Sequence, residues 1–390
     1  MTTEHLCKNA QANPPQTLST QGPRDPSTQP EGGVQREMLS HIRQYAPSLL
    51  SRLQSGLSKL PMELVWAAHS QWPLPPDPST KPPRNTHKLI RISVLDSSFN
   101  PPTLAHLALA NSPRPSYSTE PTRAEYEAKL LLLSVKNVDK ALKVGDATYL
   151  QRLQMMGLLA QDPSVRDGNV AIAITDEPTF VGKSKVLQEY LKARLASLPP
   201  ETTPQSPVGS RNTQLSFIVG LDTLERLFSP KYYPPSSGSQ ATHEDTMIKM
   251  LSRMLSPPSQ GGDDSLVVCA RRITTLPSDV GQSQSSTLDL GEAEGWMKKG
   301  VTSGVGANSD SCNPHVAEVV SGPEHCEIPK DERIVIIDIG DRASKFSSTA
   351  VRNARSRIGA LEAGVGEGPW REWVSNSVAS YVEEEGLYVS

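Results

Sequence analysis

Six runs of Val, Ile and Leu, separated by segments with helical patterns, constrain most strongly what this chain can fold into. The runs lie at residues 88–95, 129–135, 169–175, 214–220, 265–272 and 333–339. Helical patterns follow at about 103–110, 147–160 and 183–196, and begin again near 221, 348 and 370. Continuous apolar runs are typical of strands buried on both faces, and the helices between them supply parallel crossovers. We therefore expect an α/β fold, built on a doubly wound, mostly parallel sheet.

The segments before the first run differ from one another in composition. Residues 1–34 are rich in Gln, Pro, Thr and Ser, which predicts a disordered N-terminal tail. Residues 35–72 carry apolar side chains at helical spacing with a break at Pro47, so we expect a helical N-terminal extension. This extension either packs on the main domain or binds a protein partner. Residues 73–86 form a Pro-rich linker.

The overall composition indicates one large folded domain that is interrupted and flanked by polar segments. Hydrophobic residues make up 36% of the 390, and the mean hydropathy is −0.40. We place this domain at 87–390, with a low-complexity insertion at about 273–330 that we expect to be disordered and that is a second candidate for binding a protein partner. A homo-oligomer is compatible with the sequence.

Charge and apolar patterning exclude several classes of partner. A net charge of −3 and a pI near 6.3 provide no overall basic field for nucleic acid or an anionic membrane. Apolar stretches stay short of 18 residues, and no secretory signal pattern opens the chain, so we expect a soluble protein of the cytoplasm or nucleus. The cysteines and histidines match no usual zinc-ligand spacing, so we expect no resident metal site.

Two polar loops can form one anion site at the carboxyl edge of the predicted sheet. The loop after the first run reads Ser-Ser-Phe-Asn-Pro-Pro, and Thr103 and His106 follow on one face of the next helical turn. After the last run, Ser348 and Thr349 begin a helix and Arg352 lies one turn further. Each feature alone is commonplace in proteins. Together, at the ends of two strands of one sheet, they predict a phosphate-binding site.

Five motifs in order resemble one enzyme family. "SSFNPPTLAH" resembles the first loop of the nucleotidyltransferase superfamily, and "FSSTAVR" resembles its second phosphate motif. "FIVGLDTLERLF", "NVDKALKVGDATYLQRLQMMGLLA" and the ending "VASYVEEEGLY" are similar to further segments of the nicotinamide mononucleotide adenylyltransferases. With Thr103 in place of the first motif His, the eukaryotic branch, and its fungal group with long extensions, resembles the chain most. The resemblance covers about 88–272 and 333–390, and it implies a Rossmann-like nucleotidyltransferase fold.

The resemblance implies transfer of the adenylyl group of ATP to nicotinamide mononucleotide, or to its acid form, with Mg²⁺ carried in by ATP. His106 and Arg352 would be the catalytic residues. ATP would contact Ser98, Phe99, Asn100, Thr103, His106, Gly220, Asp222, Ser348, Thr349 and Arg352. The second substrate would contact Lys140, Arg152, Phe180 and Lys183.

The chain departs from the family pattern at two places. Ser97 stands where the family has Gly, and Asp96 before it would either help to hold Mg²⁺ or cap the turn. Phe180 stands where relatives carry a Trp that stacks on the nicotinamide ring, and it would either stack or anchor the core. Tyr232 and Tyr233 are alternative stacking residues.

Two other functions stay open on the sequence. A cytidylyltransferase acting on a phosphorylated alcohol would use the same fold, although such enzymes usually retain both motif His residues. A catalytically weak nucleotide-binding scaffold is the other alternative. Ser97 and the reduced aromatic pocket favour the scaffold, whereas the intact set of His106 and Arg352 disfavours it.

Overall fold

The computed structural model describes most of the chain apart from the N-terminus and several internal segments. The described residues are 31–76, 89–115, 125–136, 145–165, 168–198, 212–270, 333–360 and 368–389. Residues 1–30 of the expected tail at 1–34, most of the Pro-rich linker and the insertion at 273–330 lie outside these residues. Residues 31–34, which the sequence predicts to be disordered, begin the first helix instead.

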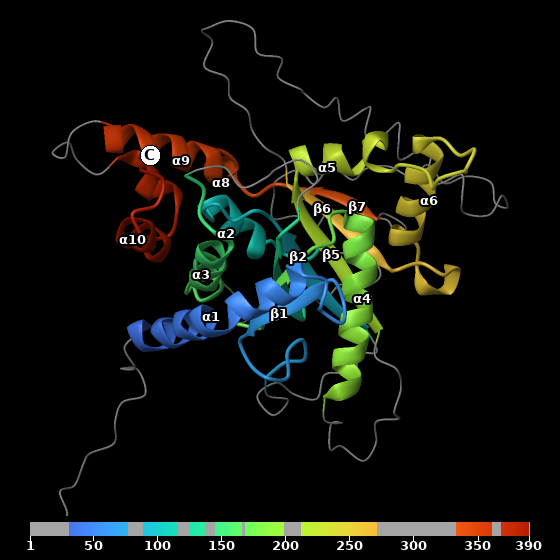
Figure 1. The fold of residues 1–390 in the computed structure, drawn as a ribbon, viewed down its shortest axis with the longest axis horizontal. Coiled ribbons are helices and arrows are strands. Elements are labelled where there is room, and N and C mark those ends of the chain that lie inside the picture. The colour runs from blue at the N-terminus through green and yellow to red at the C-terminus, as the bar shows by residue number, and fades with distance from the viewer. Residues whose placement is uncertain are drawn as a thin grey trace, which may run out of the picture.

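A seven-stranded sheet forms the centre of the described structure (Figure 1), with the strand order β1-β4-β3-β2-β5-β6-β7. Its strands are β1 (Met62–Ala67), β2 (Leu89–Asp96), β3 (Ala128–Ser134), β4 (Val170–Thr175), β5 (Asn212–Gly220), β6 (Ser265–Ala270) and β7 (Ile334–Ile337). The pairs from β4 to β7 are all parallel, and β1 alone runs antiparallel, against β4. The order reverses at β2, which lies between β3 and β5, so the doubly wound, mostly parallel sheet that the sequence predicts is confirmed.

Helices cover both faces of the sheet, as the apolar strands require. They are α1 (Glu31–Gln54), α2 (Leu104–Ala110), α3 (Tyr149–Ala160), α4 (Phe180–Ser197), α5 (Leu221–Leu227), α6 (His243–Leu255), α8 (Asp341–Ser344), α9 (Ser348–Ala360) and α10 (Asn376–Glu384). Short 3₁₀ turns lie at η1 (Pro230–Tyr232), η2 (Pro258–Gln260) and η3 (Pro369–Trp373). The helices α1 to α3 pack on one face, and α4 to α6 pack on the other.

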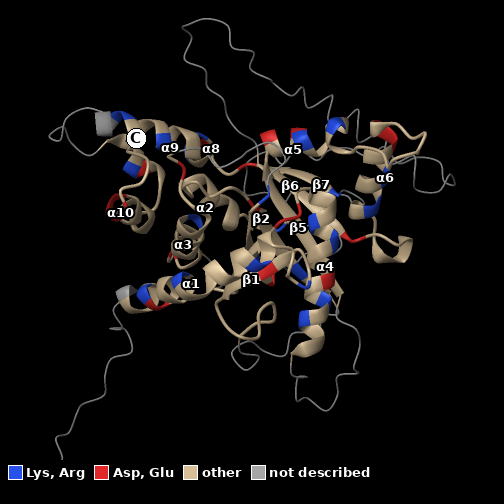
Figure 2. Ribbon diagram, in the orientation of Figure 1, with Lys and Arg blue, Asp and Glu red and all other residues tan. Residues whose placement is uncertain are grey.

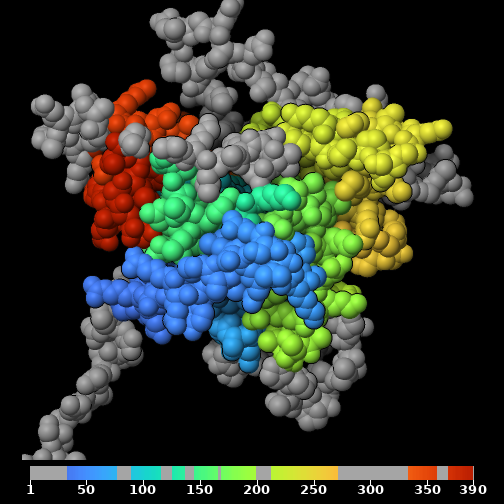
Figure 3. All heavy atoms as spheres, in the orientation of Figure 1, coloured from blue at the N-terminus to red at the C-terminus, as the bar shows by residue number. Residues whose placement is uncertain are grey.

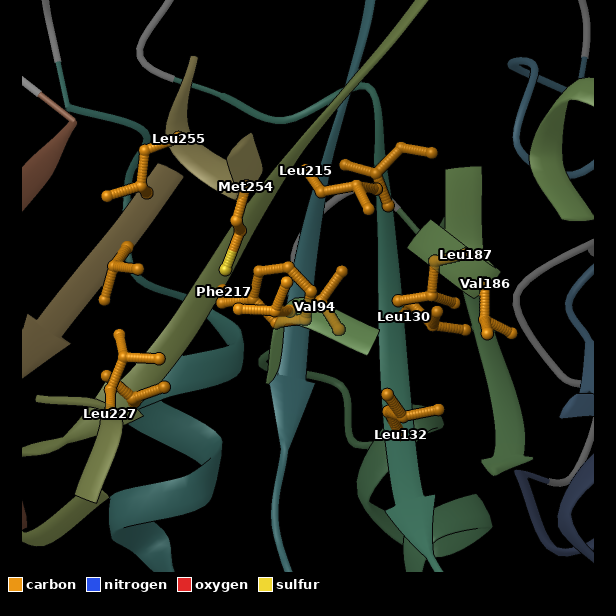
Figure 4. Close-up of a cluster of buried hydrophobic side chains, with 14 of the residues drawn as sticks. Val94, Leu130, Leu132, Val186, Leu187, Leu215, Phe217, Leu227, Met254 and Leu255 are labelled. Carbon is orange, nitrogen blue, oxygen red and sulfur yellow. The ribbon is translucent and has the colours of Figure 1, made fainter. Parts of the chain in front are cut away.

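The larger hydrophobic core lies between the sheet and helices α4 to α6. Figure 4 shows the side chains of its central strands and covering helices meeting there; the labelled residues include Val94, Leu130, Leu132, Val186, Leu187, Leu215, Phe217, Leu227, Met254 and Leu255. A second core fills the opposite face, and a third joins α3 to α9, η3 and α10. The third core fixes the C-terminal helices against the sheet domain.

The segment 35–72 differs from the helical extension that the sequence predicts. Its first part is a single helix, α1, that continues through Pro47 without a break. Its second part contains the edge strand β1, which pairs with β4. Ile42 and Leu53 of α1 are almost fully buried, and Figure 3 shows the N-terminal segment lying directly against the body of the molecule. The extension is therefore an integral layer of the domain.

The sequence of β1, Met-Glu-Leu-Val-Trp-Ala, explains this difference, because it is apolar apart from Glu63 and shows no period-two alternation that would have indicated a strand. Met62 and Val65 are buried, whereas the residues between them are half-buried, because an edge strand shares one side with solvent.

Among the described helices, none is both long enough and apolar enough to cross a membrane.

Candidate active site

A cavity of about 960 Å³ opens beyond the carboxyl ends of the parallel strands. The ends of β2, β3, β5 and β6 and the first turns of α3, α4, α5 and α9 contribute to its walls. This is the edge at which ligands bind in doubly wound sheets, because loops and helix N-termini meet there. The predicted site residues that line the cavity are Ser98, Asn100, His106, Arg152, Phe180, Lys183, Gly220, Asp222, Ser348, Thr349 and Arg352.

The cavity wall carries more positive than negative side chains. Its lining contains five basic residues, Lys136, Arg152, Lys183, Arg226 and Arg352, against three acidic residues, Asp96, Asp146 and Asp222. Figure 2 shows both signs of charge mixed along the outer helices α1, α4 and α6. The positive excess is therefore a local property of the cavity, and it suits an anionic ligand.

His106 is held in one orientation at the start of α2. The backbone N–H of Thr103 donates to His106 Nδ1 at 3.0 Å, so in the neutral ring Nδ1 is the acceptor and Nε2 carries the proton. His106 Nε2 lies 2.9 Å from Ser97 Oγ, and this geometry makes Ser97 the acceptor. The imidazole therefore lies in the cavity wall with its one N–H donated to Ser97, which lines the same wall.

Asp146 joins the two arginines of the predicted site. Its carboxylate lies 3.6 Å from Arg152 Nη2 and 3.7 Å from Arg352 Nε. Asn100 donates from Nδ2 to the same carboxylate at 2.8 Å. Burial lowers the pKa of Arg152, and Asp146 opposes that shift. One acid thus holds two guanidinium groups, from α3 and from α9, at the cavity wall.

The N-terminus of α9 meets the first loop directly. Arg352 donates from Nη1 to the Asn100 carbonyl at 2.6 Å, and Ser348 donates from Oγ to the Pro101 carbonyl at 2.7 Å. Ser347 Oγ accepts from the backbone N–H of Ala350 at 3.1 Å and so caps the helix. The structure therefore brings together the two phosphate motifs that the sequence predicts to converge.

A buried ion pair lies on another part of the wall. Lys183 Nζ donates to Asp96 Oδ2, and these side chains are only 5% and 7% exposed. The ammonium also lies 4.8 Å from the centre of the Phe180 ring. Asp96 therefore pairs with Lys183, which differs from both sequence hypotheses for this residue, a metal ligand or a cap of the turn.

Aromatic side chains from four segments line the cavity: Tyr149, Phe180, Tyr232 with Tyr233, and Phe346. Phe180 meets Phe217 edge-to-face, with ring centres 5.6 Å apart, and also lines the cavity. Phe180 thus makes the core contact that one of its two sequence hypotheses expects, and its place in the wall leaves stacking on a ligand ring as a prediction. Tyr232 and Tyr233 line the cavity too, and Tyr233 donates its hydroxyl to the Leu227 carbonyl at 2.7 Å.

Two predicted site residues that the structure describes do not line the cavity, and a third is not among the described residues. Phe99 is fully buried and packs beneath His106, with ring centres 5.3 Å apart, because its positive φ of 45° turns the side chain into the core. Thr103 is buried and orients His106. Lys140 lies outside the described residues.

Two residues that the sequence analysis did not select also belong to the site. Asp146 lies just before α3, and only the convergence of two distant arginines reveals its role. Tyr388 donates its hydroxyl to Asn100 Oδ1 at 2.8 Å and so ties the C-terminus to the first loop. The ending "GLY" is part of a segment that resembles the family, but the resemblance did not indicate this contact.

The carboxylates of the cavity offer little to a resident metal. Among the described residues, no group of three or more His, Cys, Asp or Glu side chains is arranged to hold a metal ion. Asp96 is committed to Lys183, and Asp146 to the two arginines. The donor set suits a Mg²⁺ ion that enters bound to the phosphates of a substrate.

Fold and cavity together define a doubly wound α/β protein with a cleft, richer in basic than in acidic side chains, at the switch point of its sheet. No family model matches the sequence. Over 150 residues it is 32% identical to a Schizosaccharomyces pombe protein described as "Putative nicotinamide mononucleotide adenylyltransferase". The match covers 38% of this chain and 47% of the relative, so the chain spans about half the length of the curated relative it matches. This similarity agrees with the resemblance that the five motifs indicate.

Two solved structures are similar in topology. Both are nicotinic acid mononucleotide adenylyltransferase from Plasmodium falciparum, one complexed with NaAD and the other with APC. Each is 11% identical and covers 77% of this chain and 97% of its own, with TM-scores of 0.40 and 0.39. At TM-scores of this size the likeness carries no argument about activity.

Proposed function

We propose that this protein transfers the adenylyl group of ATP to nicotinamide mononucleotide or nicotinate mononucleotide, releasing pyrophosphate. The observation that carries the proposal is the convergence of His106, Arg152 and Arg352 on one cavity at the switch point of the sheet. These residues belong to the motifs that resemble the family. The similarity to the fission-yeast relative supports the same activity.

The reaction needs little covalent help from the protein. A phosphate oxygen of the mononucleotide attacks the α-phosphorus of ATP, the bond to the β-phosphate oxygen breaks, and pyrophosphate leaves. Because the attacking oxygen already carries negative charge, no strong general base is required. Orientation of the substrates and neutralisation of phosphate charge therefore supply most of the rate enhancement.

The residues of the cavity suit distinct parts of this task. When ATP binds, the Nε2–H of His106 exchanges its bond to Ser97 for one to a phosphate oxygen of ATP. Arg352 and the first turn of α9 face the departing pyrophosphate, and Arg152 faces the phosphate of the acceptor. Mg²⁺, when bound to the ATP phosphates, neutralises part of their charge.

The direct test is to incubate the purified chain with Mg-ATP and nicotinamide mononucleotide and to measure NAD and pyrophosphate. We expect His106→Ala to lower the rate about 10²- to 10³-fold. His243→Ala, which changes a histidine outside the cavity lining, is the matched control and should keep the parent rate. ATP binding without pyrophosphate from either mononucleotide would reject the proposal, and activity with CTP and a phosphorylated alcohol would replace it with a cytidylyltransferase.

A further inference from the structure

The Asp96–Lys183 pair is an unusual component of a cavity wall. Both side chains line the cavity although they are 93% or more buried. Asp96 ends β2, and Lys183 lies in the first turn of α4, so the pair lies where the strand order reverses. Withdrawing two charges from water is costly, and such pairs are often kept for specificity rather than for stability.

The pair also retains hydrogen-bonding capacity. An ammonium has three N–H donors, and the described hydrogen bonds of Lys183 comprise one, to Asp96 Oδ2. Asp96 accepts that bond and a second one from Ser134 Oγ at 3.3 Å, whereas a carboxylate can accept about four. The wall therefore offers a buried donor group, the ammonium, and a buried acceptor group, the carboxylate, side by side.

The ring of Phe180 places this donor and acceptor next to a surface suited to an aromatic ligand. Lys183 Nζ lies 4.8 Å from the ring centre, and the ring lines the cavity. A flat heterocycle stacked on Phe180 would bring a substituent at its edge close to the pair. The substituent that matches a neighbouring donor and acceptor is a carboxamide, whose carbonyl accepts and whose NH₂ group donates.

We infer that Asp96 and Lys183 select an acceptor with a carboxamide on its ring over the corresponding carboxylic acid. This inference rests on the proposed function and specifies its acceptor as the amide mononucleotide. A carboxylate would gain Lys183 but would face the like charge of Asp96 in a dry site. A carboxamide carries no net charge and can satisfy both partners at once.

The test is the ratio of kcat/KM for nicotinamide mononucleotide to that for nicotinate mononucleotide. We expect a ratio above one for the parent chain. Asp96→Asn removes the negative charge with little change in volume, and we expect it to lower the ratio by about tenfold, chiefly by improving turnover of the acid. Glu127→Gln is the matched control, because Glu127 pairs with Arg91 outside the cavity lining, and it should leave the ratio unchanged.

A second variant tests the role of the cation, and it keeps the inference testable if Asp96→Asn does not fold. Lys183→Met removes the cation, so the acid loses its partner while Asp96 remains, and we expect the ratio to rise. A parent ratio of one or less, or ratios that stay constant in both variants, would overturn the inference while leaving the adenylyltransferase intact. Absence of product with both mononucleotides in the parent chain would instead reject the proposed function, and the inference with it.

Discussion

At the scale of single residues, the site depends on groups that hold other groups in place. Thr103 fixes the tautomer of His106, and Asn100 connects the Tyr388 hydroxyl to Asp146. His106 could be predicted from the sequence because it follows a buried strand at a fixed offset. Asp146 could not, because its importance comes from two arginines that approach it from other elements.

We expect Asp146→Asn to destabilise the ligand-free protein by about 1–2 kcal/mol, because two partly buried guanidinium groups lose their shared anion. The phosphates of ATP can replace that anion. Mg-ATP should therefore raise the Tm of this variant by more than it raises the Tm of the parent. Thermal melts with and without Mg-ATP measure both effects.

Glu189→Gln provides the control for this experiment. Glu189 forms an exposed pair with Lys185 at 3.9 Å, which should contribute under about 0.5 kcal/mol. If ATP raises the Tm of both variants and of the parent by the same increment, Asp146 does not compete with phosphate for the arginines.

At the scale of elements, the strands were the most predictable part of the fold. The six parallel strands are continuous apolar runs, and burial on both faces leaves few alternatives for such sequences. The edge strand β1 was missed because its buried residues, Met62 and Val65, are three positions apart and so continue the helical spacing of the leucines before them. Pro47 was overweighted as a break, since α1 continues through it.

The packing of α1 leads to a prediction about stability. Ile42 is fully buried between α1 and the rest of the second core, so Ile42→Ala should lower the free energy of unfolding by about 2–4 kcal/mol. Tyr45, on the same helix, is 46% exposed, so Tyr45→Ala should change it by less than about 1 kcal/mol. Urea denaturation of the full chain compares the two variants. Equal, small effects would mean that α1 is a detachable extension after all.

At the scale of the whole molecule, the site exists only because the topology gathers distant segments. The loop after β2, the start of α3, the start of α4 and the start of α9 meet at one sheet edge. The sequence predicted this convergence, since parallel strands of one sheet share a carboxyl edge. It could not predict the side-chain pairs formed there, such as Asp96 with Lys183, because they depend on register between segments far apart in the chain.

A second long-range contact, between His69 and Asn169, lies at the amino-terminal end of β4 and makes the stability of the protein depend on pH. Asn169 donates from Nδ2 to the carbonyls of Pro73 and Glu127, so its Oδ1 is the acceptor that faces His69. His69 Nε2 lies 2.9 Å from this oxygen and therefore carries the proton of the neutral ring. Its Nδ1 is buried and has no hydrogen-bond partner among the described residues. Protonation of Nδ1 is thus disfavoured in the folded state.

The sign of the pH effect follows from this contact. Desolvation by burial lowers the pKa of His69 below its ordinary value, outweighing the hydrogen bond that His69 donates to Asn169, which raises the pKa. A pKa that is lower in the folded state means that the unfolded chain binds the proton more readily. His69 therefore contributes stability that is present above the unfolded pKa of about 6.5 and is lost as the pH falls toward the lower, folded pKa.

We expect His69→Gln to lessen the decrease in the free energy of unfolding between pH 7.5 and pH 5.5. Glutamine can still donate to Asn169 Oδ1, but it does not titrate, so the contact is kept while its pH dependence is lost. Urea denaturation of the parent and the variant at several pH values gives the two curves. Other titrating groups act equally in both proteins, so the difference between the curves isolates His69. Parallel curves would show that its ring gains the proton as easily in the folded protein as in the unfolded chain.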